Sequence, residues 1–297
     1  MSAGRSHLLL VNPSAGGGRV RHLLPEVEAT LQARGVDHRT VLTENIEHAL
    51  GEARTASQAG QAVVVMSGDG LIGQVGGGLA GTGTPLGVIP GGRGNDFARV
   101  VGIPTEIGAA VDLLAAGHTR EIDVGEVNGR RFLCIASCGF DSDCNRIANE
   151  TRFIKGNLVY LYAVLRAMAA WKPARFTVVL DGESHEFTGY SVAAANGKAY
   201  GGGMFFAPDA ELDDGRLDIV WVSQVPKLRY LAHVPSVFRG RHVEHDEVTV
   251  LRGTEVELSA DRPFAVYADG DHITDLPARV RVLPRALRVI APAGSGT

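Results

Sequence analysis

The stretch from Ala62 to Leu79, AVVVMSGDGLIGQVGGGL, constrains the fold more than any other part of the chain. Its first five residues are apolar and mostly β-branched, which predicts a strand buried on both faces of a parallel sheet. Ser67–Gly70 follows at once, and a helical pattern starts near Ile72. A strand that turns sharply into a helix directs backbone N–H groups at one point, which suits an anion such as phosphate.

Asp69 is the unexpected residue of this turn, because a carboxylate repels a bare phosphate. It could be a metal partner or a proton acceptor, or it could only cap the helix. The stretch is not a Walker A loop, since no Gly-Lys-Ser/Thr follows the glycines. Asp69 is therefore a candidate catalytic residue whose role the turn alone leaves open.

Strand-like and helix-like segments alternate through residues 1–120. The expected strands are His7–Val11, Val36–Leu42, Ala62–Met66 and Pro85–Pro90. The expected helices follow Val20, Ile46, Ile72, Asp96 and Glu106. This alternation predicts an N-terminal three-layer α/β domain with a parallel sheet.

Residues 121–297 show a different pattern of many short strands with frequent turns. The expected strands are Glu121–Val127, Arg131–Ala136, Arg175–Leu180, His185–Ala194, Arg216–Val222, Glu247–Val250, Glu255–Ser259, Phe264–Ala268 and Val280–Val282. One helix is expected, at Leu158–Ala170, with an apolar stripe that could be core or could contact lipid. The pattern predicts a mostly antiparallel β-sandwich domain, and Ala286–Ala291 could join it or return to the first domain.

Three of the expected parallel strands end in glycine-rich or polar loops: Asn12–Gly18, Ser67–Gly70 and Gly91–Asn95. Ligands of open α/β sheets bind beyond the carboxyl ends of the strands, so three such loops favour a phosphate site there. The first loop lacks the G-x-G-x-x-G spacing, which disfavours a dinucleotide fingerprint.

Composition excludes several classes of protein. A net charge of −4 gives no electrostatic support for nucleic-acid binding. Three cysteines cannot form an even disulfide framework and have no zinc-site spacing, which favours a reducing cytoplasm. The N-terminus has too short an apolar core for a signal peptide, and no apolar run is long enough to span a membrane. Any lipid contact is therefore expected to be peripheral.

With these loops in view, the sequence resembles the diacylglycerol kinase catalytic-domain family, which also holds sphingosine kinases and bacterial lipid kinases. The resemblance covers nearly the whole chain. The motifs that carry it are Val11–Gly16 (VNPSAG), Ser67–Leu71 (SGDGL), Ile89–Arg99 (IPGGRGNDFAR), Gly139–Asp141, Ala195–Gly197, Gly201–Met204, Ala207–Ala210, Leu212–Gly215 and Ala268–Asp271. The departures from the family pattern are Gln74 for Glu, Arg93 for a small hydroxyl residue and Asp271 for Glu.

The resemblance implies a kinase that uses ATP and Mg²⁺ and transfers the γ-phosphate to a lipid hydroxyl, with diacylglycerol favoured over a sphingoid base. It implies an active site between the two domains and a cytoplasmic protein that meets the membrane peripherally; a homodimer stays open. Two alternatives remain. One is a non-catalytic nucleotide- or lipid-binding relative, suggested by Gln74 and Arg93. The other is a soluble-substrate kinase related to NAD kinases and phosphofructokinases, which share the Gly-Asp-Gly turn.

The family's functional residues map onto matching positions of this chain. The implied catalytic residues are Asp69, Asp269 and Asp271. The implied nucleotide-binding residues are Asn12, Pro13, Ser14, Ala15, Gly16, Thr43, Gly68, Asp69, Gly70, Gln74, Arg93 and Asn95. The implied metal-binding residues are Asp96, Asp123, Glu211, Asp214 and Arg216.

Residue-level reasoning bears on some of these assignments. Asp69, Asp96 and Asp123 follow successive strands and could meet at one point, although Asp96 could only cap a helix and Asp123 could be a solvated strand end. Asp269 and Asp271 would share a face if they lie on a strand, or they could form an ordinary Asp-Gly turn.

Two further positions each allow two interpretations. The resemblance implies that Asp214 holds a structural Mg²⁺ with the carbonyls of Glu211 and Arg216, whereas by composition alone Asp213–Gly215 is a turn signature. Arg93 could reach the transferring phosphate, or it could point to solvent or pair with Asp96.

Overall fold

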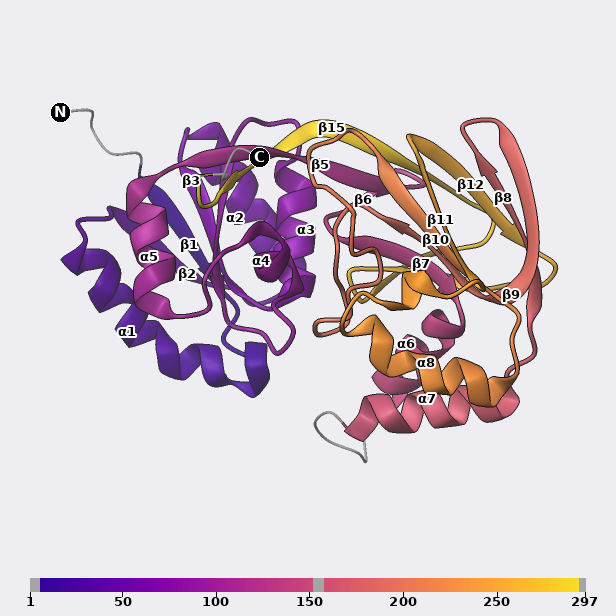
Figure 1. Cartoon of the computed structure of the whole chain (residues 1–297). Coiled ribbons are helices and arrows are strands. Elements are labelled where there is room, and N and C mark those ends of the chain that lie inside the picture. The colour runs from indigo at the N-terminus through magenta and orange to yellow at the C-terminus, as the bar shows by residue number, and fades with distance from the viewer. Residues whose placement is uncertain (1–5, 152–157, 294–297) are drawn as a thin grey trace.

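The computed structural model describes residues 6–151 and 158–293. Figure 1 shows two lobes, of which the first is formed by the N-terminal part of the chain, coloured indigo to magenta. The second lobe contains most of the strands and a group of helices coloured magenta to orange.

The first lobe is a parallel α/β domain, as predicted. Its strands are β1 (His7–Val11), β2 (His38–Leu42), β3 (Ala62–Ser67) and β4 (Pro85–Pro90), paired in parallel in the order β4-β3-β1-β2. Its helices are α1 (Arg19–Ala33), α2 (Ile46–Gln58), α3 (Asp69–Leu79), α4 (Asp96–Val101) and α5 (Ile107–Ala116), and a short 3-10 turn, η1 (Ala15–Gly17), precedes α1. Helix α3 starts at Asp69, earlier than the predicted start near Ile72, so Asp69 lies in its first turn.

Both faces of β1, β3 and β4 are buried, which explains their apolar sequences, whereas β2 (HRTVL) lies at the edge of the sheet and is partly exposed. Leu8 and Leu10 of β1 pack in the cluster that contains Ala49 of α2 and Ile72 of α3. Their neighbour Leu9 packs in a second cluster, with residues of α1 and α5. Alternate residues of β1 therefore pack against the helices on opposite faces of the sheet. The predicted three-layer arrangement is confirmed (Figure 1).

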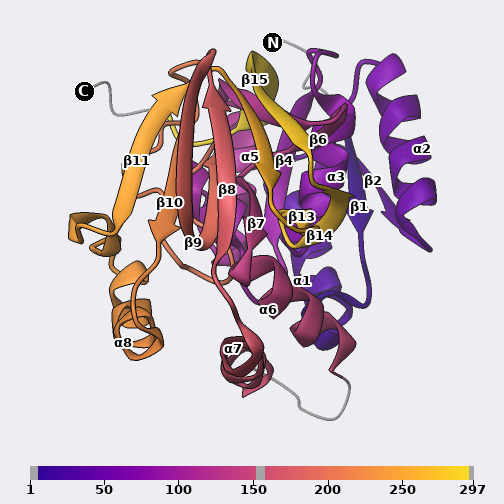
Figure 2. The same ribbon diagram turned by 90° about the vertical axis from the view of Figure 1, so that its right-hand side faces the viewer.

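The second lobe is mostly antiparallel. Its strands are β5 (Thr119–Val127), β6 (Arg130–Phe132), β7 (Ile135–Gly139), β8 (Ala174–Leu180), β9 (Glu183–Ala195), β10 (Leu217–Ser223), β11 (Val248–Gly253), β12 (Glu255–Ala260), β13 (Ala265–Ala268), β14 (Asp271–Asp275) and β15 (Ala278–Ile290). Its helices are α6 (Phe140–Glu150), α7 (Leu158–Ala170) and α8 (Lys227–Val237), with a 3-10 turn η2 (His242–Glu244). Figure 2 shows α6, α7 and α8 below the ends of the strands. The predicted β-sandwich class is confirmed.

Several details of this lobe differ from the predictions. The expectation of one helix was wrong, because α6 and α8 are also helical. Helix α8 contains Pro235, and α6 begins directly after Gly139 at φ 114°. Both helices were missed because proline and glycine usually mark the end of a helix or a turn. The single strand expected at Arg131–Ala136 is divided between β6 and β7, and β14 was not predicted.

The last strand, β15, resolves the open question of where the chain end goes. Its first part pairs with β12, where Val280 lies opposite Val256. Its end pairs in parallel with β4, where Arg288 lies opposite Pro85. The described strands thus form one sheet with the main order β14-β13-β7-β9-β8-β12-β15-β4-β3-β1-β2. Strand β15 belongs to both lobes and fixes them to each other.

Two observations concern contact with lipid. The apolar stripe expected on α7 includes Leu158 and Leu161, whose side chains lie outside the described residues, and Leu165 on the same helix is 54% exposed. Within the described ranges, every helix is too short or too polar to cross a membrane.

Candidate active site

The three glycine-rich loops of the first lobe touch one another, as their places at the strand ends predicted. A Cβ atom on Gly16 would lie 2.5 Å from the carbonyl oxygen of Gly91, and one on Gly92 would lie 2.6 Å from Cα of Gly68. Real Cβ atoms do not approach backbone so closely, and only glycine permits these contacts. The loops at 12–18, 67–70 and 91–95 therefore form one continuous backbone surface.

Short polar side chains shape this surface from within. Asn12 accepts a hydrogen bond from the backbone N–H of Ser14 at 3.0 Å, which tightens the first loop. Asn95 has φ 51° and accepts a hydrogen bond from the N–H of Gly92 at 2.9 Å, which closes the third loop. Thr43 donates from its N–H and from its hydroxyl to the Val11 carbonyl, at 2.8 and 3.2 Å. These predicted nucleotide-binding residues thus set the loop conformation.

Asp69 lies at the junction of the second and third loops. Its Oδ1 accepts a hydrogen bond from the N–H of Phe97 at 3.1 Å, whereas its Oδ2 has no hydrogen-bond partner among residues 6–151 and 158–293. Burial raises the pKa of this carboxyl, the N–H groups at the start of α4 oppose the rise, and the neighbouring Asp96 carboxylate adds to it. A partly buried carboxylate with a free oxygen is thus held beside the loops.

Asp96 is the second acid at this junction. A Cβ atom on Gly94 would lie 3.0 Å from Asp69 Oδ2 and 3.1 Å from Asp96 Oδ2, so both carboxylates lie against the same glycine. Asp96 Oδ1 accepts from Arg99 at 2.7 Å, and its Oδ2 accepts from the N–H of Gly202 at 2.7 Å. Asp96 therefore joins the third loop to the 201–203 segment of the second lobe.

Arg93 has no hydrogen bond or ion pair with the described residues. The expected alternative of a pair with Asp96 was wrong, because Arg99 holds that place. The side chain of Arg93 extends towards the first loop, where a Cβ atom on Gly17 would lie 3.7 Å from Arg93 Nη2. A free guanidinium is thus presented at the edge of the loop surface.

Asp269 and Asp271 approach from the second lobe, where Asp269 lies in the turn between β13 and β14 and Asp271 is the first residue of β14. The argument that a strand places them on one face was wrong, because β13 ends at Ala268 and Asp269 has φ 49°. Asp269 accepts backbone hydrogen bonds from Leu133, Cys134 and Ile135, at 2.7, 2.9 and 3.2 Å. Burial nevertheless raises the pKa of Asp269 to about 6, against the lowering effect of these N–H groups.

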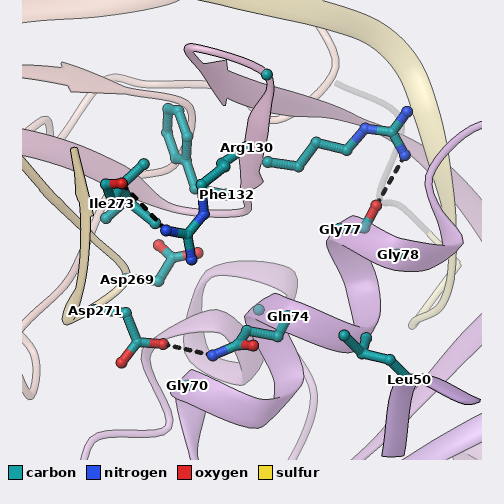
Figure 3. Close-up of a pocket in the computed structure, with 14 residues that line it drawn as sticks. Leu50, Gly70, Gln74, Gly77, Gly78, Arg130, Phe132, Asp269, Asp271 and Ile273 are labelled. Carbon is teal, nitrogen blue, oxygen red and sulfur yellow. Dashed lines mark hydrogen bonds between the residues drawn. The ribbon is translucent and has the colours of Figure 1, made fainter. Parts of the chain in front are cut away.

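Asp271 has a different partner. Its Oδ2 accepts a hydrogen bond from Gln74 Nε2 of α3 at 2.9 Å (Figure 3). Two of the three departures from the family pattern therefore contact each other, across the boundary between the lobes.

A pocket of about 360 Å³ opens beside this contact. Gly70, Gln74, Asp269 and Asp271 line it, together with residues that sequence reasoning did not single out: Leu50, Arg130, Arg131, Phe132 and Ile273. Arg131 donates to the carbonyls of Gly77 and Ala80 at 2.9 and 2.8 Å, and Arg130 donates to that of Ile273 at 3.1 Å. Arg130 and Arg131 are adjacent at the start of β6, and this basic pair was the available signal in the sequence.

Asp123 does not join the Asp69–Asp96 junction, contrary to the expected convergence of three carboxylates. Its two oxygens accept the backbone N–H groups of Gly215 and Arg285, each at 2.7 Å. Burial raises the pKa of Asp123, and the nearby Asp214 and Asp213 carboxylates add to the rise. Asp123 therefore stabilises the 213–215 turn. The convergence with Asp69 and Asp96 was predicted wrongly because the order of the strands in the sequence does not indicate which loop each acid faces.

The residues expected to hold a structural cation lie around the same turn. Asp214 accepts the N–H of Arg216 at 2.9 Å, and Asp213 forms an ion pair with Arg120 at 2.8 Å. Glu211, Asp214 and Arg216 are exposed. Across the two described ranges, no group of three or more His, Cys, Asp or Glu side chains is arranged to hold a metal ion. The structural cation stays a prediction.

The candidate site thus combines three glycine loops of a parallel α/β domain, which meet beside Asp69, with acids from a mostly antiparallel second domain. Comparison with known families identifies this combination. The diacylglycerol kinase catalytic domain matches residues 6–127, and the YegS C-terminal NAD kinase beta sandwich-like domain matches residues 134–291. The chain belongs to the diacylglycerol kinase family.

Comparison with individual proteins agrees with this assignment. A diacylglycerol kinase of Mycobacterium tuberculosis is 37% identical over 95% of this chain and 94% of its own length. One from Staphylococcus aureus is 28% identical over 96% of this chain and 91% of its own length. A crystal structure of a diacylglycerol kinase from Bacillus anthracis shares the fold, with a TM-score of 0.78 at 23% identity over 98% of both chains.

Proposed function

We propose that this protein is an ATP-dependent lipid kinase that transfers the γ-phosphate to a lipid hydroxyl, with diacylglycerol favoured over a sphingoid base. Support for the substrate comes from the M. tuberculosis relative named diacylglycerol kinase, which is similar over almost its whole length. The observation that carries the proposal is Asp69, whose Oδ2 is free beside three touching glycine loops.

The loops provide what phosphoryl transfer requires of a protein, which is mainly positioning and charge stabilisation. The glycines at 16, 68 and 92 let the three loops pack into one backbone surface on which phosphates can lie, and the first turn of α3 directs N–H groups towards them. The free Arg93 guanidinium can pair with a phosphate in bidentate fashion. The nucleotide is therefore proposed to lie across the loops, with its terminal phosphate beside Asp69.

Among the acids of the site, Asp69 is the best placed to take the proton of the acceptor hydroxyl. Both oxygens of Asp269 accept hydrogen bonds from backbone, and Asp271 is held by Gln74. The raised pKa of Asp69 also brings its proton affinity closer to what a general base needs near neutral pH. In this proposal Asp269 positions the β13–β14 turn, and Asp271 positions α3 against it.

Mg²⁺ fits the acids of this site. It prefers one or two carboxylates combined with waters and phosphate oxygens. Asp69 and Asp96 both lie against Gly94, and of the two only Asp69 has an oxygen that accepts no hydrogen bond from the described residues. When bound there, the ion would neutralise charge on the nucleotide phosphates. Because the lipid substrate resides in a membrane, we infer a cytoplasmic protein that meets the bilayer peripherally.

The test is a lipid kinase assay with labelled ATP, Mg²⁺ and vesicles that contain diacylglycerol, sphingosine or neither. We expect phosphorylated diacylglycerol from the parent protein. Asp69→Asn should lower the rate by roughly a hundred- to ten-thousandfold, as for loss of a general base. Its fold should persist, because asparagine can still accept the Phe97 N–H. The control Asp112→Asn, which removes only the exposed ion pair with Arg34, should keep full activity.

The alternatives give different results in the same assay. A non-catalytic relative would bind ATP but would label no lipid. A soluble-substrate kinase would label a soluble acceptor and ignore the vesicles. Near-normal turnover by Asp69→Asn would overturn the assignment of Asp69.

A further inference from the structure

A second and larger pocket lies in the second lobe, between α6, α7 and the segment at 262–265 that leads from β12 into β13. Its volume is about 510 Å³, and it shares no lining residue with the pocket beside Asp271. Ala265 lines the second pocket and Ala268 lines the first, so the two pockets lie at opposite ends of β13. The proposed phosphoryl transfer does not use this second pocket.

The lining of this pocket is strongly basic. It contains the cationic residues Arg146, Arg166, Lys172 and Arg262 and a single carboxylate, Asp143. Arg146 forms ion pairs with Asp143 at 3.3 Å and with Glu150 at 3.2 Å. The other three cations have no carboxylate partner within the described part of the chain. Positive charge in the pocket therefore exceeds the negative charge that the protein supplies.

Arg262 is held in one orientation. Its Cζ lies 5.0 Å from the ring centre of Trp171 and 4.9 Å from that of Phe264, and Nη2 donates to the Lys172 carbonyl. Stacking on aromatic rings orients a guanidinium, while its remaining N–H groups stay available as donors. An arginine fixed in this way has less side-chain entropy to lose when it binds an anion.

Trp171 supplies a second, independent observation. This lining residue is 4% exposed, and its indole N–H is buried without a hydrogen-bond partner among the described residues. A buried donor without an acceptor costs about 1–3 kcal/mol. A ligand oxygen would remove that cost on binding if the side chains that cover the N–H move apart.

We propose that this pocket binds a phosphate group, and that it is a site separate from the active site. A phosphate offers several acceptor oxygens and a double negative charge, which match the Arg262 fork, the Lys172 ammonium and the unpaired indole N–H. The phosphate could belong to a soluble phosphomonoester or to the head group of a phosphomonoester lipid. The chemistry recognised is the same in both cases, and the experiment separates the two sources.

The sequence offers a direct reporter, because the chain has two tryptophans, Trp171 and Trp221. Trp221→Phe leaves Trp171 as the sole tryptophan and keeps an aromatic ring on Phe187. Fluorescence of this variant is followed during titration with inorganic phosphate and glycerol 3-phosphate. In a second arm it is followed with phosphatidylcholine vesicles that contain or lack phosphatidic acid. Phosphate bound at the glycine loops of the first lobe would not change this signal.

We expect a saturable change in Trp171 fluorescence in at least one arm, weakened by added salt. Arg262→Gln with Arg166→Gln should weaken binding by roughly tenfold or more, as for loss of charge-assisted hydrogen bonds. Lys172→Gln, at an exposed position, should weaken binding without any effect on folding. The control Arg39→Gln, which removes an exposed arginine of β2 paired with Glu52, should leave binding unchanged.

A response to the soluble ligands would identify a phosphomonoester as the source, and a response only to the acidic vesicles would identify a lipid head group. The proposal is overturned if neither arm changes Trp171 fluorescence, or if Lys172→Gln and the folded double variant bind as the parent does. Because the readout is binding and not turnover, it does not depend on whether the protein is an active lipid kinase.

Discussion

Gln74 Nε2 donates a hydrogen bond of 2.9 Å to Asp271 Oδ2, and this bond joins α3 of the first lobe to β14 of the second. The family pattern has a glutamate at each of these positions. In this chain the two positions hold the amide of Gln74 and the shorter carboxylate of Asp271, and the amide donates a hydrogen bond to the carboxylate. The two departures are therefore coupled, so neither one alone argues for a non-catalytic relative.

Gln74→Glu tests this coupling. The change places a second carboxylate within hydrogen-bond distance of Asp271, where like charges repel and raise the pKa of one of them. We expect the free energy of unfolding near pH 7 to fall by roughly 1–2 kcal/mol. The loss should shrink as the pH falls, because protonation of one of the two acids removes the repulsion. Urea denaturation at several pH values measures it, and Gln74→Met is the control for loss of the bond without added charge.

Equal stability of Gln74→Glu and the parent protein across this pH range would contradict the coupling. A loss of the same size in Gln74→Met would assign the effect to the missing hydrogen bond and not to charge repulsion.

Asp141, at the start of α6, makes a pH-dependent contribution to stability. Its Oδ1 is buried without a hydrogen-bond partner among the described residues, and its Oδ2 accepts from the Tyr200 hydroxyl at 3.3 Å. Burial raises the pKa of this carboxyl to about 6. The folded state therefore holds the Asp141 proton more tightly than the unfolded state does. This group's contribution is fully present below its unfolded pKa and is lost as the pH rises through about 6.

Asp141→Asn removes this titration. Between about pH 4 and pH 7 the stability of the parent should fall relative to that of the variant by roughly 2–3 kcal/mol, since one pKa unit corresponds to about 1.4 kcal/mol. Asp269, whose pKa is also raised to about 6, titrates in both proteins and cancels in the difference. Denaturation curves measured over this pH range provide the test. Parallel stability profiles for the two proteins would show that Asp141 has no such raised pKa.

Local sequence pattern predicted the features of the site that depend on strand ends. The loops at 12–18, 67–70 and 91–95 meet because the carboxyl ends of adjacent parallel strands lie at one edge of a sheet. The same reasoning failed for Asp123, which lies within β5 of the second lobe and accepts hydrogen bonds from Gly215 and Arg285, both distant from it in sequence. No local pattern encodes which of many antiparallel segments packs against a given acid.

The backbone conformation around Asp269 and in α8 also could not be predicted from the local sequence. Asp269 lies at φ 49° in a turn, which an Asp-Gly pair permits but does not require. The three N–H groups at 133–135 that hold its carboxylate come from a distant segment, where one expected strand is divided in two. Proline at 235 hid α8, because a proline inside a helix usually ends it.

Asp214→Ala tests whether the 213–215 turn holds a structural cation. If it does, Mg²⁺ should raise the melting temperature of the parent protein and not that of the variant, because a ligand of the native state stabilises it by mass action. The measurement is made without nucleotide. Asp213→Ala, which removes only the ion pair with Arg120, should keep the Mg²⁺ response. If Asp214→Ala retains that response, the turn is held by protein contacts alone, including the bonds that Asp123 accepts from Gly215 and Arg285.

Arg93 gives the sharpest test of the nucleotide site, because its guanidinium is exposed and unpaired within the described residues and lies beside Gly17. If it contacts a nucleotide phosphate, Arg93→Ala should lower the catalytic rate by roughly ten- to a thousandfold, as for loss of one charged contact. Arg93→Lys should restore only part of the rate, since an ammonium cannot reproduce the bidentate fork. Arg93→Thr, which restores the family residue, should be the mildest change.

Steady-state kinetics with ATP and lipid varied separately provide the measurement for the Arg93 series. A contact with the nucleotide should change the parameters for ATP and leave the KM for lipid unaltered. Arg99→Gln is a comparison variant of a different kind, because Arg99 is already paired with Asp96 and also donates to the Gly94 carbonyl. It should destabilise the third loop and lower the melting temperature, which the Arg93 variants should not do. If Arg93→Ala matches the parent protein, the loops act through their backbone N–H groups alone, and Arg93 is only a solvated side chain.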